Sequence, residues 1–231
     1  MRLLALDTSS IACSVAVQKD AAIVERHEEQ PREHTRLLVP MIESSLSEAG
    51  MTLADLDAII LGNGPGSFIG MRIAASVAQG LAFGAGLKIV PVSSLAAVAA
   101  QVFAENDAGE VVVAQDAHMH EVYLGVYRRD ADALAAELMP ERLQGPAAIA
   151  ELDSSLDGSR VAAGFGWQRY PDLLAANQAH IGEVSDVLHP RACHLLPLGA
   201  AGLANGLAVA PEDIVPAYLR QKVAEKPAEK N

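Results

Sequence analysis

The chain has 231 residues, of which 51% are hydrophobic and 4% aromatic, so Ala, Leu and Val side chains must fill most of its core. Its 17 Lys and Arg residues against 29 Asp and Glu residues give a formal net charge of −12, which disfavours direct binding of nucleic acid without a partner. Two cysteines are too few for a metal-thiolate site, and no apolar stretch reaches the roughly 20 residues of a membrane span, so we expect a cytoplasmic protein with no membrane contact.

The first part of the chain alternates between strand and helix patterns. Residues 2–7, 12–18 and 22–25 predict three strands of an antiparallel meander, with a polar turn at residues 8–10. The apolar spacing and the Gly and Pro positions that follow predict helices at residues 37–46, 68–83 and 94–103 and strands at residues 58–61 and 89–92. This order, βββαβαβα, predicts an α/β fold with a mixed sheet and helices packed on it.

A second copy of the same pattern begins at residue 111. Residues 116–126 align with residues 7–17 without a gap, so that Asp116 matches Asp7 at the end of an apolar strand. We therefore predict a duplicated lobe. The predicted units are a first lobe at residues 1–106, a smaller second lobe at 107–221 and a disordered tail at 222–231.

The second lobe has the weaker pattern. We predict a helix at residues 146–152, a strand at 160–163, a turn at 164–166 and a last helix at about 190–203 that packs back on the first lobe.

A glycine-rich loop at residues 62–72 is the sharpest local motif. Backbone N–H groups of Gly64, Gly66 and Ser67, with Asp7 near by, can cradle a phosphate of a nucleotide at a helix start. The Walker and dinucleotide spacings do not fit, however, and glycines that serve only a tight turn explain the loop equally well. Asp7 and Asp116 have the same two interpretations, a hydrated cation or a cap on the turn.

Small residues recur every four positions after this loop, at Gly70, Ala74, Ala78 and Ala82. This stripe allows very close packing, either on the lobe's own sheet or on a partner helix. The histidine pairs 118/120 and 189/194 lack the spacing of a metal site, so we predict neither a metal site nor a catalytic residue.

Four segments together resemble the bacterial TsaB (YeaZ) family. They are residues 4–9, residues 32–40, the loop at 64–72 with its Phe68 and Arg72, and residues 216–220. The resemblance covers residues 1–220 and implies a two-lobe actin/Hsp70-like (ASKHA) fold. It also implies a part in placing the threonylcarbamoyl group on the adenosine beside the anticodon of tRNAs that read codons starting with adenine.

In that pathway the transfer is made by a relative, TsaD, supported by TsaB and the ATPase TsaE. TsaD-type catalysts carry a metal-binding His-x-x-x-His pair where this chain has Ser94 and Val98, and a small-residue adenosine turn where it has Phe165 and Trp167. The resemblance therefore implies a non-catalytic subunit with no cofactor of its own, ATP or ADP being held, if at all, at a partner interface. Alternatives are a nucleotide-binding switch, or a peptidase, for which no nucleophile constellation is visible.

The resemblance further implies that the two first-lobe helices pair with those of TsaD in a heterodimer, or with a second copy when the chain is alone. TsaE would join the complex, and tRNA would be contacted only through it. Six residues would then belong to the partner interface rather than to the core: Leu37, Leu38, Met41, Gly70, Ala74 and Ala78.

Overall fold

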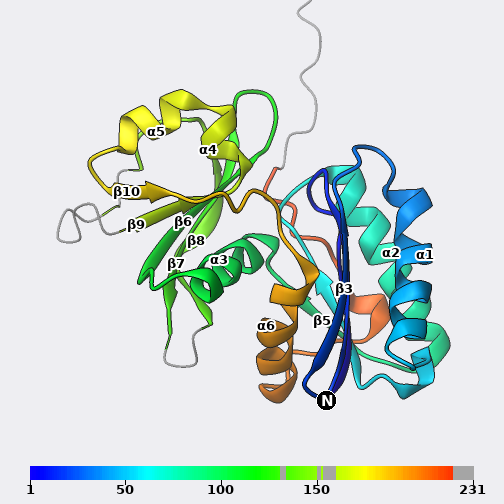
Figure 1. Ribbon diagram of the computed structural model, residues 1–231. Helices are drawn as coiled ribbons and strands as arrows, with labels where there is room; N and C mark the ends of the chain where they lie inside the picture. Colours follow the sequence, from blue (N-terminus) through cyan, green and yellow to red (C-terminus); the bar gives the residue numbers. More distant parts are fainter. Residues whose placement is uncertain (131–133, 150–151, 153–159, 221–231) are drawn as a thin grey trace, which may run out of the picture.

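The computed structural model describes residues 1–130, 134–149, 152 and 160–220. It has two lobes, each built on a five-stranded mixed sheet (Figure 1). The order of the strands is the same in the two sheets, β3-β2-β1-β4-β5 in the first and β8-β7-β6-β9-β10 in the second when read in the same direction. The predicted duplication of a mixed sheet is confirmed.

The first sheet combines the predicted meander with two parallel strands. Its strands are β1 (Arg2–Asp7), β2 (Cys13–Lys19), β3 (Ala22–Glu28), β4 (Ala58–Gly62) and β5 (Ile89–Val92). β1 pairs with β2 in antiparallel fashion and with β4 in parallel. Helices cover both faces of its centre, which is why β1 and β4 are almost continuous runs of buried apolar residues.

The second sheet repeats this plan. Its strands are β6 (Glu110–Asp116), β7 (Val122–Arg129), β8 (Ala135–Gln144), β9 (Arg160–Ala163) and β10 (Ile181–Val184). β6 pairs with β7 in antiparallel fashion and with β9 in parallel, as β1 does with β2 and β4. The duplication therefore brings Asp7 and Asp116 to the same position at the end of the central strand of each sheet.

The helices form three layers around the two sheets (Figure 1). The first sheet has α1 (His34–Glu48) and α2 (Phe68–Ala85) on its outer face and α6 (Ala192–Ala204) on its inner face. The second sheet has α3 (Ser94–Glu105) on its inner face and α4 (Phe165–Arg169) with α5 (Pro171–Asn177) on its outer face. α3 and α6 touch, so that the lobes meet through these two inner helices, α6 being the last predicted helix. Short 3-10 turns lie at Leu53–Asp55 and Pro211–Asp213.

Helix α2 has two contrasting faces. The Ser67 hydroxyl caps its start by accepting the Gly70 N–H at 3.2 Å, and Gly86 ends it in a left-handed conformation (φ 67°). Ala74 and Ala78 are fully buried against the sheet. Within the described residues, α2 is the one helix long and apolar enough to cross a membrane by length and composition, yet it is a core helix on this side.

Three parts of the second lobe differ from the prediction. The described residues of the predicted helix 146–152, namely 146–149 and 152, lie outside helices and strands. β8 was not predicted, because its Ala, Glu, Leu and Met residues favour helix and only pairing with β7 makes it a strand. The short elements α4, α5 and β10 were missed as well. The tail predicted at 222–231 lies outside the described residues.

Candidate functional site

The glycine loop packs directly on the turn between β1 and β2. A Cβ atom added at Gly66 or Gly70 would lie closer than 3.0 Å to the carbonyl oxygens of Ser9 and Thr8 respectively. The Ser67 N–H donates to the Ser9 carbonyl at 2.6 Å, and the Thr8 hydroxyl donates to the Gly70 carbonyl at 2.7 Å. Only glycine permits this backbone-to-backbone contact. The loop therefore covers the turn that a phosphate would otherwise approach.

Asp7 lies beneath this contact and is 1% exposed. Its carboxylate accepts hydrogen bonds from the Ser94 hydroxyl at 2.5 Å and from the Ser9 N–H and hydroxyl at 2.7 and 2.8 Å. Burial raises the pKa of Asp7 although each of these bonds lowers it. The Gly64 N–H donates to the same Ser94 hydroxyl at 3.1 Å.

Of the four residues predicted to contact a phosphate, Asp7, Gly64 and Gly66 are buried and the Ser67 hydroxyl caps α2. The N–H groups of Gly64 and Ser67 and the carboxylate of Asp7 are bonded to the chain's own loops and turns. This geometry supports the alternative that the glycines serve a tight, closely packed connection between β4 and α2.

Ser94 and Val98, which the resemblance predicted to replace a histidine pair of TsaD-type proteins, are both internal. Ser94 bonds Asp7 and Gly64, and Val98 is a fully buried core residue against the second sheet. Among the residues that the structure describes, no group of three or more His, Cys, Asp or Glu side chains is placed to hold a metal ion.

A groove of about 410 Å³ runs between the outward faces of α1 and α2, and we name it the α1–α2 groove. Its lining is almost entirely apolar, with Val39 43%, Phe68 45% and Ile69 70% exposed. It is lined by Thr35, Leu38 and Val39 from α1 and by Phe68, Ile69, Arg72, Ile73, Ser76 and Val77 from α2.

Five of the six predicted interface residues, Leu38, Met41, Gly70, Ala74 and Ala78, are buried, and Leu37 is partly buried against the same core. Leu38 also lines the α1–α2 groove, and the part of the six residues in a partner contact stays a prediction. Small side chains let α2 approach the sheet closely, so this stripe faces inward.

The outward stripe is its neighbour, Ile69, Ile73 and Val77, also at four-residue spacing. The sequence contained that signal, large apolar residues beside small ones on one helix, but on α2 the prediction named only the small ones, Gly70, Ala74 and Ala78.

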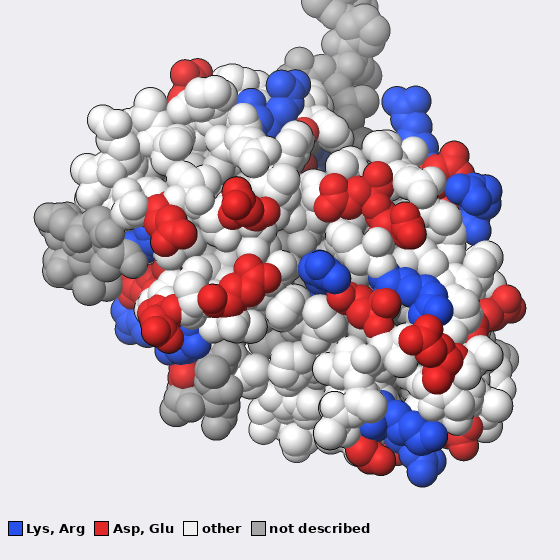
Figure 2. Space-filling model, viewed as in Figure 1, with Lys and Arg blue, Asp and Glu red and all other residues white. Residues whose placement is uncertain are grey.

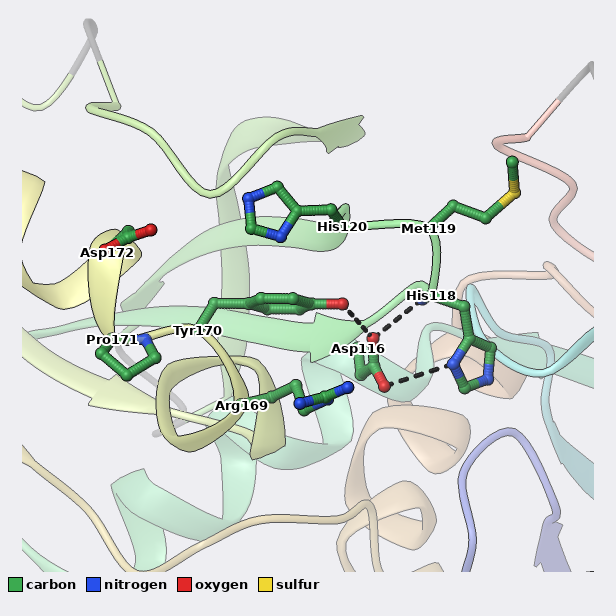
Figure 3. Close-up of a pocket in the computed structure, with 8 residues that line it drawn as sticks. All are labelled: Asp116, His118, Met119, His120, Arg169, Tyr170, Pro171 and Asp172. Carbon is green, nitrogen blue, oxygen red and sulfur yellow. Dashed lines mark hydrogen bonds and ion pairs between the residues drawn. The ribbon is translucent and has the colours of Figure 1, made fainter.

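A second, polar pocket of about 440 Å³ lies at the turn between β6 and β7 (Figure 3). Asp116 accepts the Tyr170 hydroxyl at 2.7 Å and the His118 N–H at 2.8 Å. His118, Met119 and His120 all have positive φ values of 53–60°, a strained run for residues other than glycine. The Asp116 carboxylate thus accepts a backbone N–H of the turn and caps it. This is one of the two roles that the sequence predicted for Asp116.

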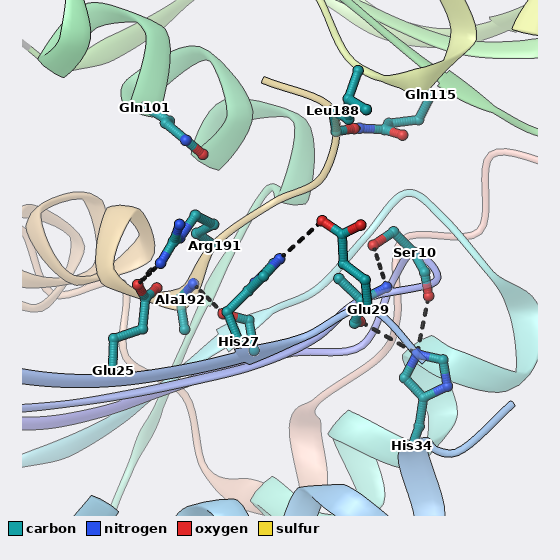
Figure 4. Close-up of polar contacts among 12 residues, drawn as sticks. Ser10, Glu25, His27, Glu29, His34, Gln101, Gln115, Leu188, Arg191 and Ala192 are labelled. Atoms are coloured by element: carbon teal, nitrogen blue, oxygen red, sulfur yellow. Dashed lines mark hydrogen bonds and ion pairs between the residues drawn. The ribbon is translucent and has the colours of Figure 1, made fainter. Parts of the chain in front are cut away.

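The segment that runs from the second lobe into α6 has polar contacts with both sheets (Figure 4). Glu25 accepts the Arg191 guanidinium at 2.5 and 3.1 Å and the Cys193 N–H at 3.1 Å. Above them, Gln115 donates to the Leu188 carbonyl at 2.7 Å. The connecting segment is therefore bonded to the second sheet at Leu188 and to the first sheet at the start of α6.

The two cysteines are unsuited to nucleophilic attack. Burial, followed by neighbouring carboxylates, raises the pKa of Cys13 and of Cys193 to about 12, so both are thiols at neutral pH. A peptidase mechanism through either cysteine therefore has no support in this geometry.

Two lobes with equivalent mixed sheets and an inner helix on each define the actin/Hsp70-like (ASKHA) class of α/β proteins. A family model described as tRNA N6-adenosine threonylcarbamoyltransferase (TsaD) matches residues 24–228. Proteins named tRNA threonylcarbamoyladenosine biosynthesis protein TsaB are similar over almost their whole length. The one from Escherichia coli K12 is 40% identical over 98% of this chain and 97% of its own, and the one from Haemophilus influenzae is 36% identical over 98% and 96%.

Solved structures agree with this match. YeaZ from Pseudomonas aeruginosa superposes with a TM-score of 0.87 and 37% identity, over 94% of this chain and 99% of that one. A second crystal structure, described as an uncharacterized protein with similarity to peptidase YeaZ, gives the same score over 95% and 99%. The chain therefore belongs to the TsaB (YeaZ) family, as the sequence motifs predicted.

Proposed function

We propose that this chain is a non-catalytic subunit required for threonylcarbamoyl transfer to the adenosine beside the anticodon of tRNAs that read codons starting with adenine. Its Escherichia coli and Haemophilus influenzae relatives are named for the biosynthesis of that nucleoside. By the family resemblance, Ser94 and Val98 take the places of the transferase's histidine pair, and valine cannot bind a metal ion. We assign catalysis to a separate partner, TsaD, acting with TsaE.

The α1–α2 groove is the observation that carries this proposal. A non-catalytic subunit must act through a surface, and contiguous exposed apolar residues mark surfaces that bind another protein. Phe68 and Ile69 of α2 are 45% and 70% exposed and lie beside Val39 of α1, which is 43% exposed. We propose that TsaD lays its own helix pair on this groove, and that a second copy of the chain can do so when TsaD is absent.

The surface charge supports an indirect relation to tRNA. Figure 2 shows Asp and Glu side chains spread over both lobes of one face, with Lys and Arg in scattered groups between them. With a net charge of −12, the lone chain would repel a phosphate backbone. We propose that it meets tRNA only within the complex, in the cytoplasm, and that any ATP or ADP is held at the partner interface rather than in the closed glycine loop.

The test is reconstituted tRNA modification with purified TsaC, TsaD and TsaE, reading threonylcarbamoyladenosine by mass spectrometry. We expect product only when the chain is added. Ile69→Glu places a charge in the groove and should lower product by about tenfold or more without lowering stability, because Ile69 is 70% exposed.

Leu207→Glu is the matched control, since Leu207 is 59% exposed and follows α6 on the other side of the first sheet. Its product yield should equal that of the unaltered chain. Product that forms equally well without the chain would exclude the proposed function, and equal loss in the two variants would exclude the groove as its surface.

A further inference from the structure

Arg72 is the one charged side chain among the residues that line the α1–α2 groove. It is exposed, and in the part of the chain that the structure describes no carboxylate lies within ion-pair distance of its guanidinium. By contrast, Arg36 on α1 is paired with Glu33 at 2.5 Å, and Arg220 is paired with Glu121 at 2.6 Å. The groove therefore presents an unpaired cation at the edge of an apolar surface.

Arg72 is also held in place before any partner arrives. Its guanidinium carbon lies 3.3 Å from the ring centre of Phe68 and 4.9 Å from that of Tyr218. The two rings are 5.8 Å apart. Stacking on two aromatic faces fixes the plane of the guanidinium, so less side-chain entropy is lost when it receives a carboxylate.

Tyr218 belongs to a C-terminal strap, residues 214–220, that crosses the start of α2. The Asn63 amide donates to the Val215 carbonyl at 2.9 Å, and the Ala217 N–H donates to the Asn63 carbonyl at 3.0 Å. At its end, Arg220 bonds the Ala117 carbonyl at 2.9 Å, in the turn after β6. Both ends of the strap are anchored, so Tyr218 is a positioning residue for Arg72.

We propose that Arg72 is the specificity-determining residue of the α1–α2 groove, and that it receives a carboxylate from a partner whose contacting helix is otherwise apolar. This inference rests on the proposed function, because it assumes that the groove is a docking surface. Docking removes water from Arg72, and an exposed cation that becomes buried loses hydration that only an opposite charge with good hydrogen-bond geometry can replace. A bidentate carboxylate fits the fixed plane of the stacked guanidinium.

The same reasoning makes a second copy of this chain the poorer occupant. A two-fold dimer places the same residues on both sides of the contact, and no Asp or Glu is among the lining residues. The acidic residues next to the α1 side of the groove are Glu33, which immediately precedes α1 and is paired with Arg36, and Glu43, which lies one turn beyond Val39. Two Arg72 side chains would then be desolvated without a carboxylate from the groove.

The experiment compares hetero-association and self-association in the same set of full-length variants. Calorimetric titration with purified TsaD, at low and high salt, gives the first, and sedimentation equilibrium of the chain alone gives the second. Arg72→Gln should weaken binding to TsaD by about tenfold or more and reduce its salt dependence, while self-association stays equal or tightens. Arg36→Gln, the matched removal of a positive charge outside the groove, should change either affinity by less than about twofold.

Arg72→Lys keeps the charge but loses the planar fork, so it should bind TsaD more weakly than the unaltered chain. Equal weakening of both associations by Arg72→Gln would overturn the inference, since Arg72 would then serve as a packing residue for any occupant. If self-association is lost both in Glu43→Gln and in Arg72→Gln, the inference is overturned, because a second copy of the chain would then supply the carboxylate. If the unaltered chain does not bind TsaD, the proposed function fails and the inference fails with it, a result distinct from binding that is indifferent to Arg72.

Discussion

The turns after β1 and β6, the central strands of the two sheets, have the same hydrogen bond at their start but differ in how far other segments cover them. In the first lobe the Ser9 N–H donates to Asp7, and in the second the His118 N–H donates to Asp116, in each case two residues after the aspartate. Asp7 is fully enclosed, whereas the turn after Asp116 carries exposed residues that line a pocket. The same strand and turn therefore occur in both lobes. Whether the turn is covered depends on the segment after the parallel neighbouring strand, β4 in the first lobe and β9 in the second.

Glycine makes the close contact in both lobes. In the first, Gly70 at the start of α2 touches the Thr8 carbonyl of the turn itself. In the second, Gly164 before α4 touches the carbonyl of Ala114, two residues before the turn, and leaves the turn open. The difference of a few residues in where a helix begins separates a closed site from an open one.

The largest effect is expected from Gly70→Ala, which tests the closed turn. The added Cβ would lie closer than 3.0 Å to the Thr8 carbonyl oxygen, and backbone must move to make room. We expect a loss of about 3 kcal/mol or more in the free energy of unfolding, measured by urea denaturation.

Gly80→Ala on the same helix is the control, because nothing lies within 4 Å of its added Cβ. It should raise stability by up to about 1 kcal/mol through helix propensity. Similar losses in the two variants would show that the contact with Thr8 does not matter.

Gly164→Ala tests the second lobe in the same way and should cost less, about 2 kcal/mol. It combines a φ of 99° with a contact under 3.0 Å to the Ala114 carbonyl oxygen. Gly86→Ala separates the two causes, since Gly86 has a φ of 67° and open space around it, and should cost about 1 kcal/mol. A Gly164→Ala cost above that of Gly70→Ala would reverse the comparison between the lobes.

The sequence was sufficient to predict elements that rest on local pattern. β1, the start of α2 and the duplicated Asp turn follow from apolar spacing and from matched positions such as Asp7 and Asp116. β8 could not be predicted in this way, because its composition favours a helix and it forms a strand only through pairing with β7.

For α2, the sequence predicted the helix but not which of its faces is buried. Small residues pack closely on a sheet or on a partner helix, so the Gly70, Ala74 and Ala78 stripe could not reveal which one it contacts. The sequence also could not predict that the glycine loop packs on the turn after β1, because this contact depends on the Ser9 carbonyl, which is distant from the loop in the sequence.

The smallest effect concerns the start of α3. There each lobe's sheet supplies one carboxylate to one of two adjacent serines, the buried Asp7 from the first sheet and the partly buried Glu141 from the second. The Ser94 hydroxyl donates to Asp7, and the Ser93 hydroxyl donates to Glu141 of β8, which also accepts the Tyr127 hydroxyl. Burial raises the pKa of Glu141 despite these bonds, as it does for Asp7. The carboxylates of the two lobes are therefore expected to respond to pH in the same direction.

For a group whose pKa is raised by folding, stability is fully present below the unfolded pKa, about 4.3 for Glu, and is lost as pH rises through the folded pKa. The stability of the unaltered chain relative to Glu141→Gln should therefore fall by about 1–2 kcal/mol at most as pH rises, measured by urea denaturation from about pH 4 to about pH 8. Glu25→Gln supplies a control of opposite sign. Burial would raise the pKa of Glu25, but hydrogen bonds from Arg191 and Cys193 outweigh burial and lower it, so its contribution is lost as pH falls. If the stabilities of the two variants, each relative to the unaltered chain, change in the same direction with pH, then folding does not shift the pKa of Glu141 and that of Glu25 in opposite directions.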